Sequence, residues 1–296
     1  MRFNKILAIT VLAYSAFILN LQLAHAQVLP DAVLSIKIPL ISAPTSRPMT
    51  VAYIEQYQRY YVADGGLGPV PGSDEQTSKS QMHVYDVNGA HIQTASPGFN
   101  NRSLYYNPNS RQLETITYNI SSAAGFAPNT GLFSIDTDEK GNLLQSSKDI
   151  SGPNPAFGGA ATMPTYDAAN NLYYAKQERS SVVRVVDLKS REKVAEIKVD
   201  IESAGAKYDD ISDHFIAYTG ILGEELALLD VDHRAILVFD IKGKFVGKSA
   251  LPADLKLFSK NHYNGLGYAN GMMFVYYDRL GEFGTYYGFR FSDQIK

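Results

Sequence analysis

Two polar stretches of the chain hold the residue types that most often bind metal ions or transfer protons. The stretch 207–214 reads KYDDISDH, and the stretch 258–264 reads FSKNHYN. Imidazole nitrogens and carboxylate oxygens are ligands for a divalent metal that activates water, and His214, His262 and Asp213 are the candidates for such a site. Neither stretch contains a compact metal signature such as HExxH, so we predict no cofactor and keep a divalent metal as the alternative.

A ligand-binding surface is the broader prediction for the same residues. They combine both signs of charge with amides at equivalent places of an internal repeat, whereas a purely structural ring would more often repeat one residue type. Carboxylates such as Asp209, Asp210 and Asp213 would instead serve glycoside hydrolysis, although no motif fixes their separation. The candidate ligand-binding residues are Asn101, Arg102, Asp210, Asp213, His214, His262 and Asn264.

An internal repeat of about 50 residues must position these side chains. The pattern apolar-x-apolar-apolar-Asp, as in MHVYD and ILVFD, ends at four aspartates, and Arg290 takes the same place in a fifth unit. A tyrosine near the start of each unit keeps register with this first landmark. The aspartates are Asp86, Asp136, Asp187 and Asp240, and the landmark tyrosines are Tyr53, Tyr106, Tyr166, Tyr218 and Tyr268.

Each unit offers four short strand patterns and no sustained helical period, which is typical of a β-propeller blade. The sequence therefore predicts an all-β fold: a five-bladed β-propeller with four antiparallel strands per blade, with a six-bladed ring as the alternative. The fifth unit lacks an outer strand, so we expect the strand-like segment 32–40 to complete the last blade and close the ring. The predicted blades are 49–97, 101–148, 161–200, 213–251 and 262–296 plus 32–40, within a single domain of residues 27–296.

The repeated aspartate is predicted to stabilise the turn that follows each third strand. In DVNG and DIKG a glycine stands three residues after the aspartate and supplies the positive φ of a tight hairpin, while the carboxylate accepts backbone N–H bonds. The DTDEKGN segment at 136–142 resembles a calcium loop, yet it lacks the later acidic ligands of an EF-hand. We therefore predict a structural turn there too.

The segment ILVFDIKGKFVGKS, residues 236–249, resembles the outer strands of blades in the NHL, SMP-30/gluconolactonase and YVTN-like propellers. The resemblance extends weakly over all five units and implies a fold, not an activity. The units here are longer than typical NHL repeats, and those families usually build six or more blades. The chain has no match to the SMP-30 metal-ligand motifs, so the resemblance does not imply lactonase activity.

The first 26 residues are predicted to be a secretory signal peptide. Arg2 and Lys5 precede an apolar run that ends in AHA, the small-x-small pattern of a cleavage site before Gln27. The protein is therefore predicted to be exported, to the periplasm or the extracellular medium, with no membrane span after cleavage. The absence of cysteine excludes disulfides and thiolate chemistry, and a formal net charge of −3 offers no basic footprint for nucleic acid.

Function is predicted to lie where the repeats differ. The loops 64–80 and 119–131 are longer than their counterparts in other units and would share one face with the links between blades. We predict a soluble propeller that binds a small ligand, or a protein or peptide partner, at this face without catalysis. The alternative is a hydrolase, lactonase-like or glycosidase-like, with a metal or paired carboxylates at the channel entrance.

Overall fold

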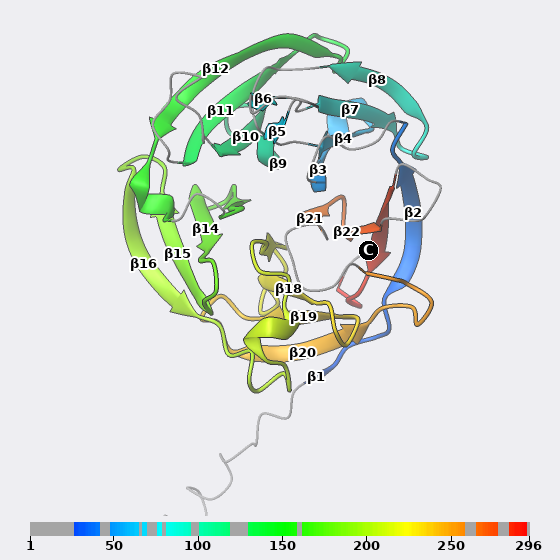
Figure 1. The fold of residues 1–296 in the computed structure, drawn as a ribbon, viewed down its shortest axis with the longest axis vertical. Coiled ribbons are helices and arrows are strands. Elements are labelled where there is room, and N and C mark those ends of the chain that lie inside the picture. Colours follow the sequence, from blue (N-terminus) through cyan, green and yellow to red (C-terminus); the bar gives the residue numbers. More distant parts are fainter. Residues whose placement is uncertain are drawn as a thin grey trace, which may run out of the picture.

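Five small antiparallel sheets stand around a central axis in the computed structural model of the chain (Figure 1). This is the predicted five-bladed β-propeller. Helical structure in the described part of the chain is limited to the short 3-10 turns η1 (Glu55–Tyr57), η3 (Pro155–Phe157) and η4 (Tyr208–Asp210), and no helix there is long and apolar enough to cross a membrane. The structure describes residues 27–41, 48–64, 67–69, 76–78, 81–95, 101–118, 130–158, 162–257, 265–277 and 284–294.

Each blade runs from an inner strand at the axis to an outer strand at the rim. Blade 1 is β3 (Pro48–Ile54), β4 (Arg59–Asp64), β7 (Gln81–Asp86) and β8 (His91–Ala95). Blade 2 is β9 (Asn101–Asn107), β10 (Gln112–Tyr118), β11 (Thr130–Thr137) and β12 (Leu143–Pro153). Blade 3 is β13 (Thr165–Asp167), β14 (Leu172–Lys176), β15 (Val182–Asp187) and β16 (Glu192–Lys198).

The last two blades contain the N-terminal strands. Blade 4 is β17 (Ala217–Tyr218), β18 (Leu226–Asp230), β19 (Ala235–Phe239), β20 (Phe245–Ala250) and β1 (Gln27–Val28). Blade 5 is β21 (Leu266–Ala269), β22 (Met272–Tyr277), β23 (Thr285–Arg290) and β2 (Val33–Pro39).

Burial along a blade explains the composition of its strands. Every residue of β18 and β19 is buried, because neighbouring blades cover both faces of these middle strands. Both alternating sets of side chains must then be apolar, which gives the continuous run AILVF in β19. At the rim, β16 is exposed at six of its seven residues and carries Glu and Lys, which protect an open strand edge from pairing with other chains.

The predicted closure of the ring is confirmed. Strand β2 pairs antiparallel with β23, from Val33 opposite Arg290 to Pro39 opposite Thr285 (Figure 1). The predicted four antiparallel strands are present in every blade, and in blade 4 the short strand β1 is added to them, parallel to β20. A two-residue strand is too short to show an alternating pattern, so the sequence carried no signal for it.

The repeated aspartate caps its turn in the predicted way. Asp86 and Asp240 each accept two backbone N–H bonds through Oδ1, at 2.8 and 2.9 Å for Asp86 and at 2.9 Å for both in Asp240. In blade 2 the capping residue is Asp138, which accepts the N–H groups of Lys140 and Asn142 at 2.8 Å. The landmark Asp136 is therefore displaced by two residues from the capping position, because this turn begins later in the chain.

The glycine of each turn lies against the preceding blade. A Cβ on Gly243 would stand 2.5 Å from the Lys198 carbonyl oxygen of blade 3, and one on Gly89 would stand 2.4 Å from the Lys37 carbonyl oxygen of blade 5. The Gly243 carbonyl accepts the Asp200 N–H at 2.9 Å. The repeated Asp-x-x-Gly turn therefore joins neighbouring blades in addition to closing its own hairpin.

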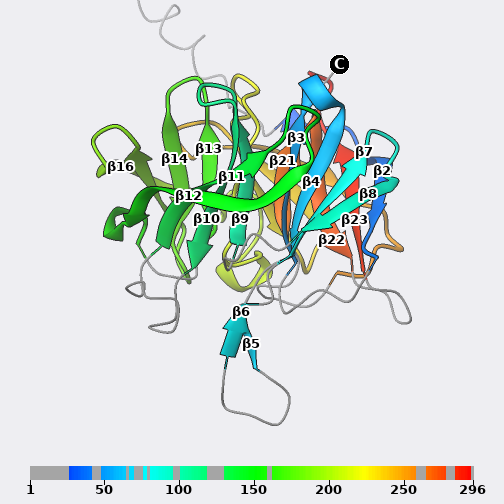
Figure 2. The ribbon, with the colours of Figure 1, turned by 90° about the horizontal axis from the view of Figure 1, so that it is seen from above.

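The two faces of the ring differ in their connections (Figure 2). We call the face that carries the links between blades and the turns between second and third strands the link face, and the opposite one the hairpin face. The insertion 64–80 of blade 1 contains a small hairpin, β5 (Leu67–Pro69) with β6 (Gln76–Ser78), which projects from the link face. Most of the other long loop, 119–131, lies outside the described residues.

Replacement of Gly243 by alanine tests the role of the turn. Gly243→Ala should lower the free energy of unfolding by about 3 kcal/mol, because it combines a left-handed backbone (φ +83°) with a clash against Lys198. Gly223→Ala is the matched control, since its φ is +81° but nothing lies within 4 Å of the added Cβ; it should cost about 1 kcal/mol. Equal losses in urea unfolding would show that the turn does not depend on the contact between blades.

Candidate functional site

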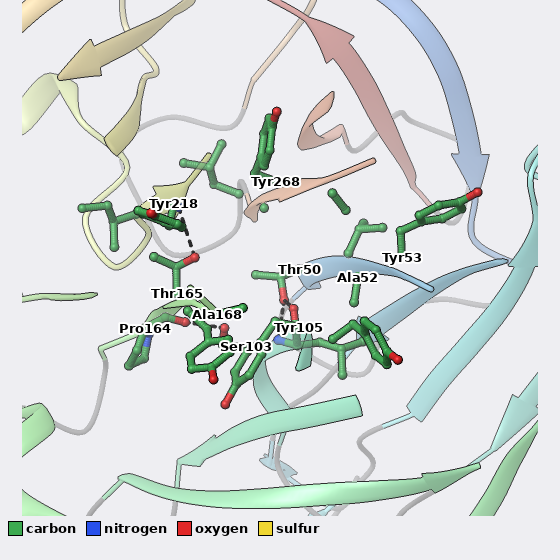
Figure 3. Close-up of a pocket in the computed structure, with 18 of the residues that line it drawn as sticks. Thr50, Ala52, Tyr53, Ser103, Tyr105, Pro164, Thr165, Ala168, Tyr218 and Tyr268 are labelled. Atoms are coloured by element: carbon green, nitrogen blue, oxygen red, sulfur yellow. Dashed lines mark hydrogen bonds between the residues drawn. The ribbon is translucent and has the colours of Figure 1, made fainter. Parts of the chain in front are cut away.

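A pocket of about 310 Å³ lies on the axis of the ring and is lined by all five inner strands (Figure 3). The lining extends along the inner strands, from Pro164 and Ile216, which stand just before β13 and β17, to the turns at 108 and 168. None of the predicted ligand-binding residues is part of this lining, but Ser103 directly follows Arg102, and Ile216 lies two residues after His214. The sequence therefore indicated the channel, but not the residues that line this axial pocket.

The landmark tyrosines line this pocket with their backbone and inner atoms, but their rings extend outward between the blades. Figure 3 shows the rings of Tyr53, Tyr218 and Tyr268 directed away from the centre of the pocket. Tyr218 stacks on Tyr174 of blade 3 at 5.3 Å with the planes 13° apart, and Tyr166 stacks on Tyr105 of blade 2 at 4.8 Å. The repeated tyrosine therefore has a structural role, since its ring packs in the seam between two blades.

Phenol groups in one of these seams meet a buried carboxylate. Glu114 is 2% exposed, and its Oε2 accepts the hydroxyls of Tyr105 at 2.7 Å and Tyr173 at 3.2 Å. Its Oε1 accepts Asn107 Nδ2 and Ser110 Oγ, both at 2.8 Å. Four donors satisfy this charge, so Glu114 holds blades 2 and 3 together and does not face the pocket.

Three hydroxyl groups at the wall of the pocket join neighbouring inner strands. Thr50 Oγ1 accepts the Leu104 N–H at 2.6 Å, and Ser103 Oγ donates to the Pro164 carbonyl. Thr165 Oγ1 accepts the Tyr218 N–H at 3.1 Å, which leaves its own O–H hydrogen as a donor for a ligand. These bonds fix the width of the channel between blades 1 and 2, 2 and 3, and 3 and 4.

None of the described residues that line the axial pocket carries a charge at neutral pH. Burial raises the pKa of Tyr268 to about 12, with a further contribution from the charge of Glu224, and it also raises the pKa of Tyr218. Both phenols therefore stay protonated over the whole physiological range. The pocket offers hydroxyl groups, backbone groups and apolar surface, and it offers no acid, base or metal ligand.

The charged groups gather instead at the link face of blades 3 and 4. Lys176 ends β14 and is 1% exposed; its Nζ donates to the Asp213 carbonyl and lies 3.3 Å from Asp213 Oδ1. The same nitrogen lies 5.1 Å from the centre of the Tyr208 ring, a cation–π contact. Burial lowers the pKa of Lys176, and Asp213 opposes that shift.

Three side chains beside Lys176 have the composition of a metal site. One ligand atom from each of Glu178, Asp213 and His214 lies within 4.8 Å of the other two. However, Asp213 Oδ1 already accepts the Arg179 N–H at 2.8 Å, and the Lys176 ammonium stands next to it. A positive charge in this place repels a divalent cation, so Lys176 weakens the metal site that the other three residues would form.

Two of the predicted site residues, Asp213 and His214, belong to this cluster. Asp210 is turned to another role: its Oδ2 accepts the Lys207 N–H at 2.7 Å and closes the turn η4. Asn101 and Arg102 begin β9, and their side chains lie outside the description, as do His262 and Asn264 altogether. The proximity of His214 and His262 stays a prediction.

Sequence reasoning missed Lys176 and Glu178. Both belong to blade 3, at the end of β14 and in the turn after it, whereas Asp213 and His214 precede blade 4. One signal was available: Lys176 follows the buried run LYYA, where the repeat elsewhere continues with apolar or short side chains. A lysine at a buried strand end indicates a paired charge.

Comparison with known proteins identifies the fold and no family. No protein-family model and no curated protein sequence matches this chain. Among solved structures, a glutaminyl cyclase from Myxococcus xanthus is similar, with a TM-score of 0.52 and 10% identity over 90% of this chain and 99% of that chain. A glucose dehydrogenase gives a TM-score of 0.48 at 8% identity, over 88% of this chain and 99% of that chain. At such identities the likeness shows a shared β-propeller fold alone.

Removal of the Lys176 charge gives a pH-dependent test of this cluster. The unfolded chain holds the Lys176 proton up to the ordinary pKa of 10.5, whereas the folded protein releases it at lower pH. The free energy of unfolding should therefore rise with pH across the interval between these two pKa values. This contribution should be absent in Lys176→Met, as measured by urea unfolding at a series of pH values.

The buried tyrosines, whose pKa values are raised, lower stability at alkaline pH equally in both proteins, so the difference between the two curves isolates Lys176. Parallel curves for the wild type and Lys176→Met would contradict the burial of a charged amine at this position.

Proposed function

We propose that this protein is an exported β-propeller that binds a small uncharged organic molecule in its axial pocket. Export is supported by the N-terminal sequence pattern, which lies outside the described residues. Binding in the channel is supported by the shape of the pocket, which is concave and contributed to by every blade. A ligand in this pocket would be surrounded by all five blades.

The uncharged lining is the observation on which the choice of ligand rests. A charged molecule that enters the pocket loses its hydration and meets no opposite charge among the described lining residues, which costs several kcal/mol. A neutral molecule loses less, and it can accept a hydrogen bond from Thr165 while its apolar part packs between Ala52 and Ile216. The volume of about 310 Å³ matches a compact molecule of one ring.

Benzamide and benzylamine, which have similar shapes and differ in charge, are suitable probes. We expect saturation-transfer NMR to show benzamide bound to the protein and benzylamine bound at least about tenfold more weakly, because the ammonium is desolvated without a partner. The affinity for benzamide should not change between about pH 6 and about pH 9, since the described lining holds no carboxylate, imidazole or ammonium group.

Ala52→Leu locates the binding. Ala52 lines the pocket and is 2% exposed, so the larger side chain fills space that a ligand would use, and benzamide binding should be lost. The matched control is Ala90→Leu at an exposed position on the outer turn of blade 1, which should leave binding unchanged. Benzamide binding that persists in a folded Ala52→Leu protein would refute the axial site.

A hydrolase is the second candidate function, and one observation favours it: the convergence of Glu178, Asp213 and His214 at the link face. A metal held there would activate water for attack on an ester, lactone or glycoside. Metal analysis of protein purified without chelator tests this candidate. Stoichiometric zinc or manganese that is lost in Asp213→Asn would support a hydrolase, whereas metal below stoichiometry in both proteins would count against it.

A further inference from the structure

A groove of about 620 Å³ lies beside the charged cluster, between blade 3 and the link to blade 4. It is formed by the turn after β14, the end of β16 and the segment that leads into η4. This groove is separate from the axial pocket, with which it shares no lining residue. Its lining residues form an apolar floor, which would contact the apolar part of a ligand, and a charged rim, which would contact a charged group.

The floor of the groove is apolar and well packed. Val199, Ile201 and Ala206 line it and belong to a buried cluster at the junction of blades 3 and 4, with exposures of 2%, 7% and 4%. The ring of Tyr208 packs against the same cluster. A floor of this kind contacts the apolar part of a ligand.

The rim of the groove carries three cationic side chains. They are Arg179, Lys198 and Lys207, and within the described residues no ion pair or side-chain hydrogen bond is recorded for any of them. The hydroxyl of Tyr208 is buried and has no hydrogen-bond partner in the described part of the chain. Three cationic side chains therefore line one groove of a protein whose net charge is negative.

Two carboxylates also line the groove, and they offset only part of the positive charge of the rim. Asp200 accepts the N–H of Ser203 at 3.1 Å and its hydroxyl at 2.6 Å, and these bonds, with a smaller contribution from the charge of Lys198, lower the pKa of Asp200. Glu202 is exposed to solvent. With three cations against two carboxylates, the lining keeps a net positive charge.

We propose that this groove binds an organic anion: a molecule with an apolar body and one carboxylate, sulfonate or phosphate group. The apolar body would lie on Val199 and Ile201, and the anionic oxygens would pair with Lys198, Lys207 or Arg179. Because the rim is open to water, each pair adds modest affinity, and the apolar floor supplies the remainder. The groove is thus a second ligand site, and its ligand is opposite in character to the neutral molecule proposed for the channel.

The test compares naphthalene-2-sulfonate with 2-naphthalenemethanol, which have the same ring system and differ in charge. Isothermal titration calorimetry should show the sulfonate bound at least about tenfold more tightly than the alcohol at low salt. This preference should diminish as sodium chloride is raised from about 20 mM to about 500 mM, because salt screens exposed charges. Equal affinities for the two probes would overturn the proposal.

A double variant, Lys198→Gln with Lys207→Gln, assigns the binding to the groove. The sulfonate affinity should fall to that of the alcohol, while the alcohol affinity stays unchanged. The control is Lys140→Gln with Lys189→Gln, two exposed lysines on the outer turns of blades 2 and 3, which removes the same charge from other surfaces. Equal losses of affinity in both double variants would show that only net charge matters, and would overturn the site.

Ala52→Leu separates this inference from the proposed function. It fills the axial pocket and should not change sulfonate binding, since no atom of the groove is altered. Loss of sulfonate binding in Ala52→Leu would place the probe in the channel and refute the groove site.

Discussion

The contact of each blade with the one before it is the constraint on which the rest of this structure depends. At the rim, the glycine of an Asp-x-x-Gly turn leaves no room for a Cβ against the backbone of the preceding outer strand, as at Gly243 and Lys198. Near the axis, a tyrosine ring packs into the same seam, as Tyr218 does on Tyr174. The glycine contact recurs between Gly89 and Lys37, and the tyrosine contact recurs between Tyr166 and Tyr105, so two kinds of contact hold neighbouring blades together.

This constraint separates residues that build the ring from residues that are free to bind. Side chains that repeat from blade to blade are committed to a turn, as Asp86 and Asp240 are, or to a seam, as Tyr166 and Tyr218 are. The residues left for function are those without counterparts, such as Thr165 in the channel and Lys207 at the groove. The two proposed sites therefore differ in charge because nothing in the repeat fixes the charge of either one.

The architecture could be predicted from the sequence because it depends on patterns that repeat. The missing outer strand of the fifth unit and the strand-like segment 32–40 predicted the closing strand, and the glycine spacing predicted the turns of blades 1 and 4. The repeat pattern predicted Asp136 as the capping residue of blade 2, two residues before the true one. A spacing of about 50 residues cannot show that this turn begins later within its own unit. Asp138, which caps that turn, is identified by the hydrogen bonds it accepts.

The candidate sites could be predicted only in part, because they are made by tertiary contacts between different blades. Asp213 and His214 were found by residue type, whereas Lys176 reaches them from the end of a strand in the preceding blade. The sequence indicated binding at the channel but not the residues of the axial pocket, because its described lining is uncharged and the rings of Tyr53, Tyr218 and Tyr268 are directed away from its centre. Sequence reasoning finds sites through charged and metal-binding residue types, and none of the described residues that line the axial pocket is of these types.

The most direct test of this account is a crystal structure of the protein soaked in a mixture of neutral, anionic and cationic fragments. The account predicts neutral fragments in the axial pocket between Ala52 and Thr165, and anionic fragments in the groove beside Lys198 and Lys207. It would be contradicted by a charged fragment in the axial pocket, or by neutral and anionic fragments that share one site.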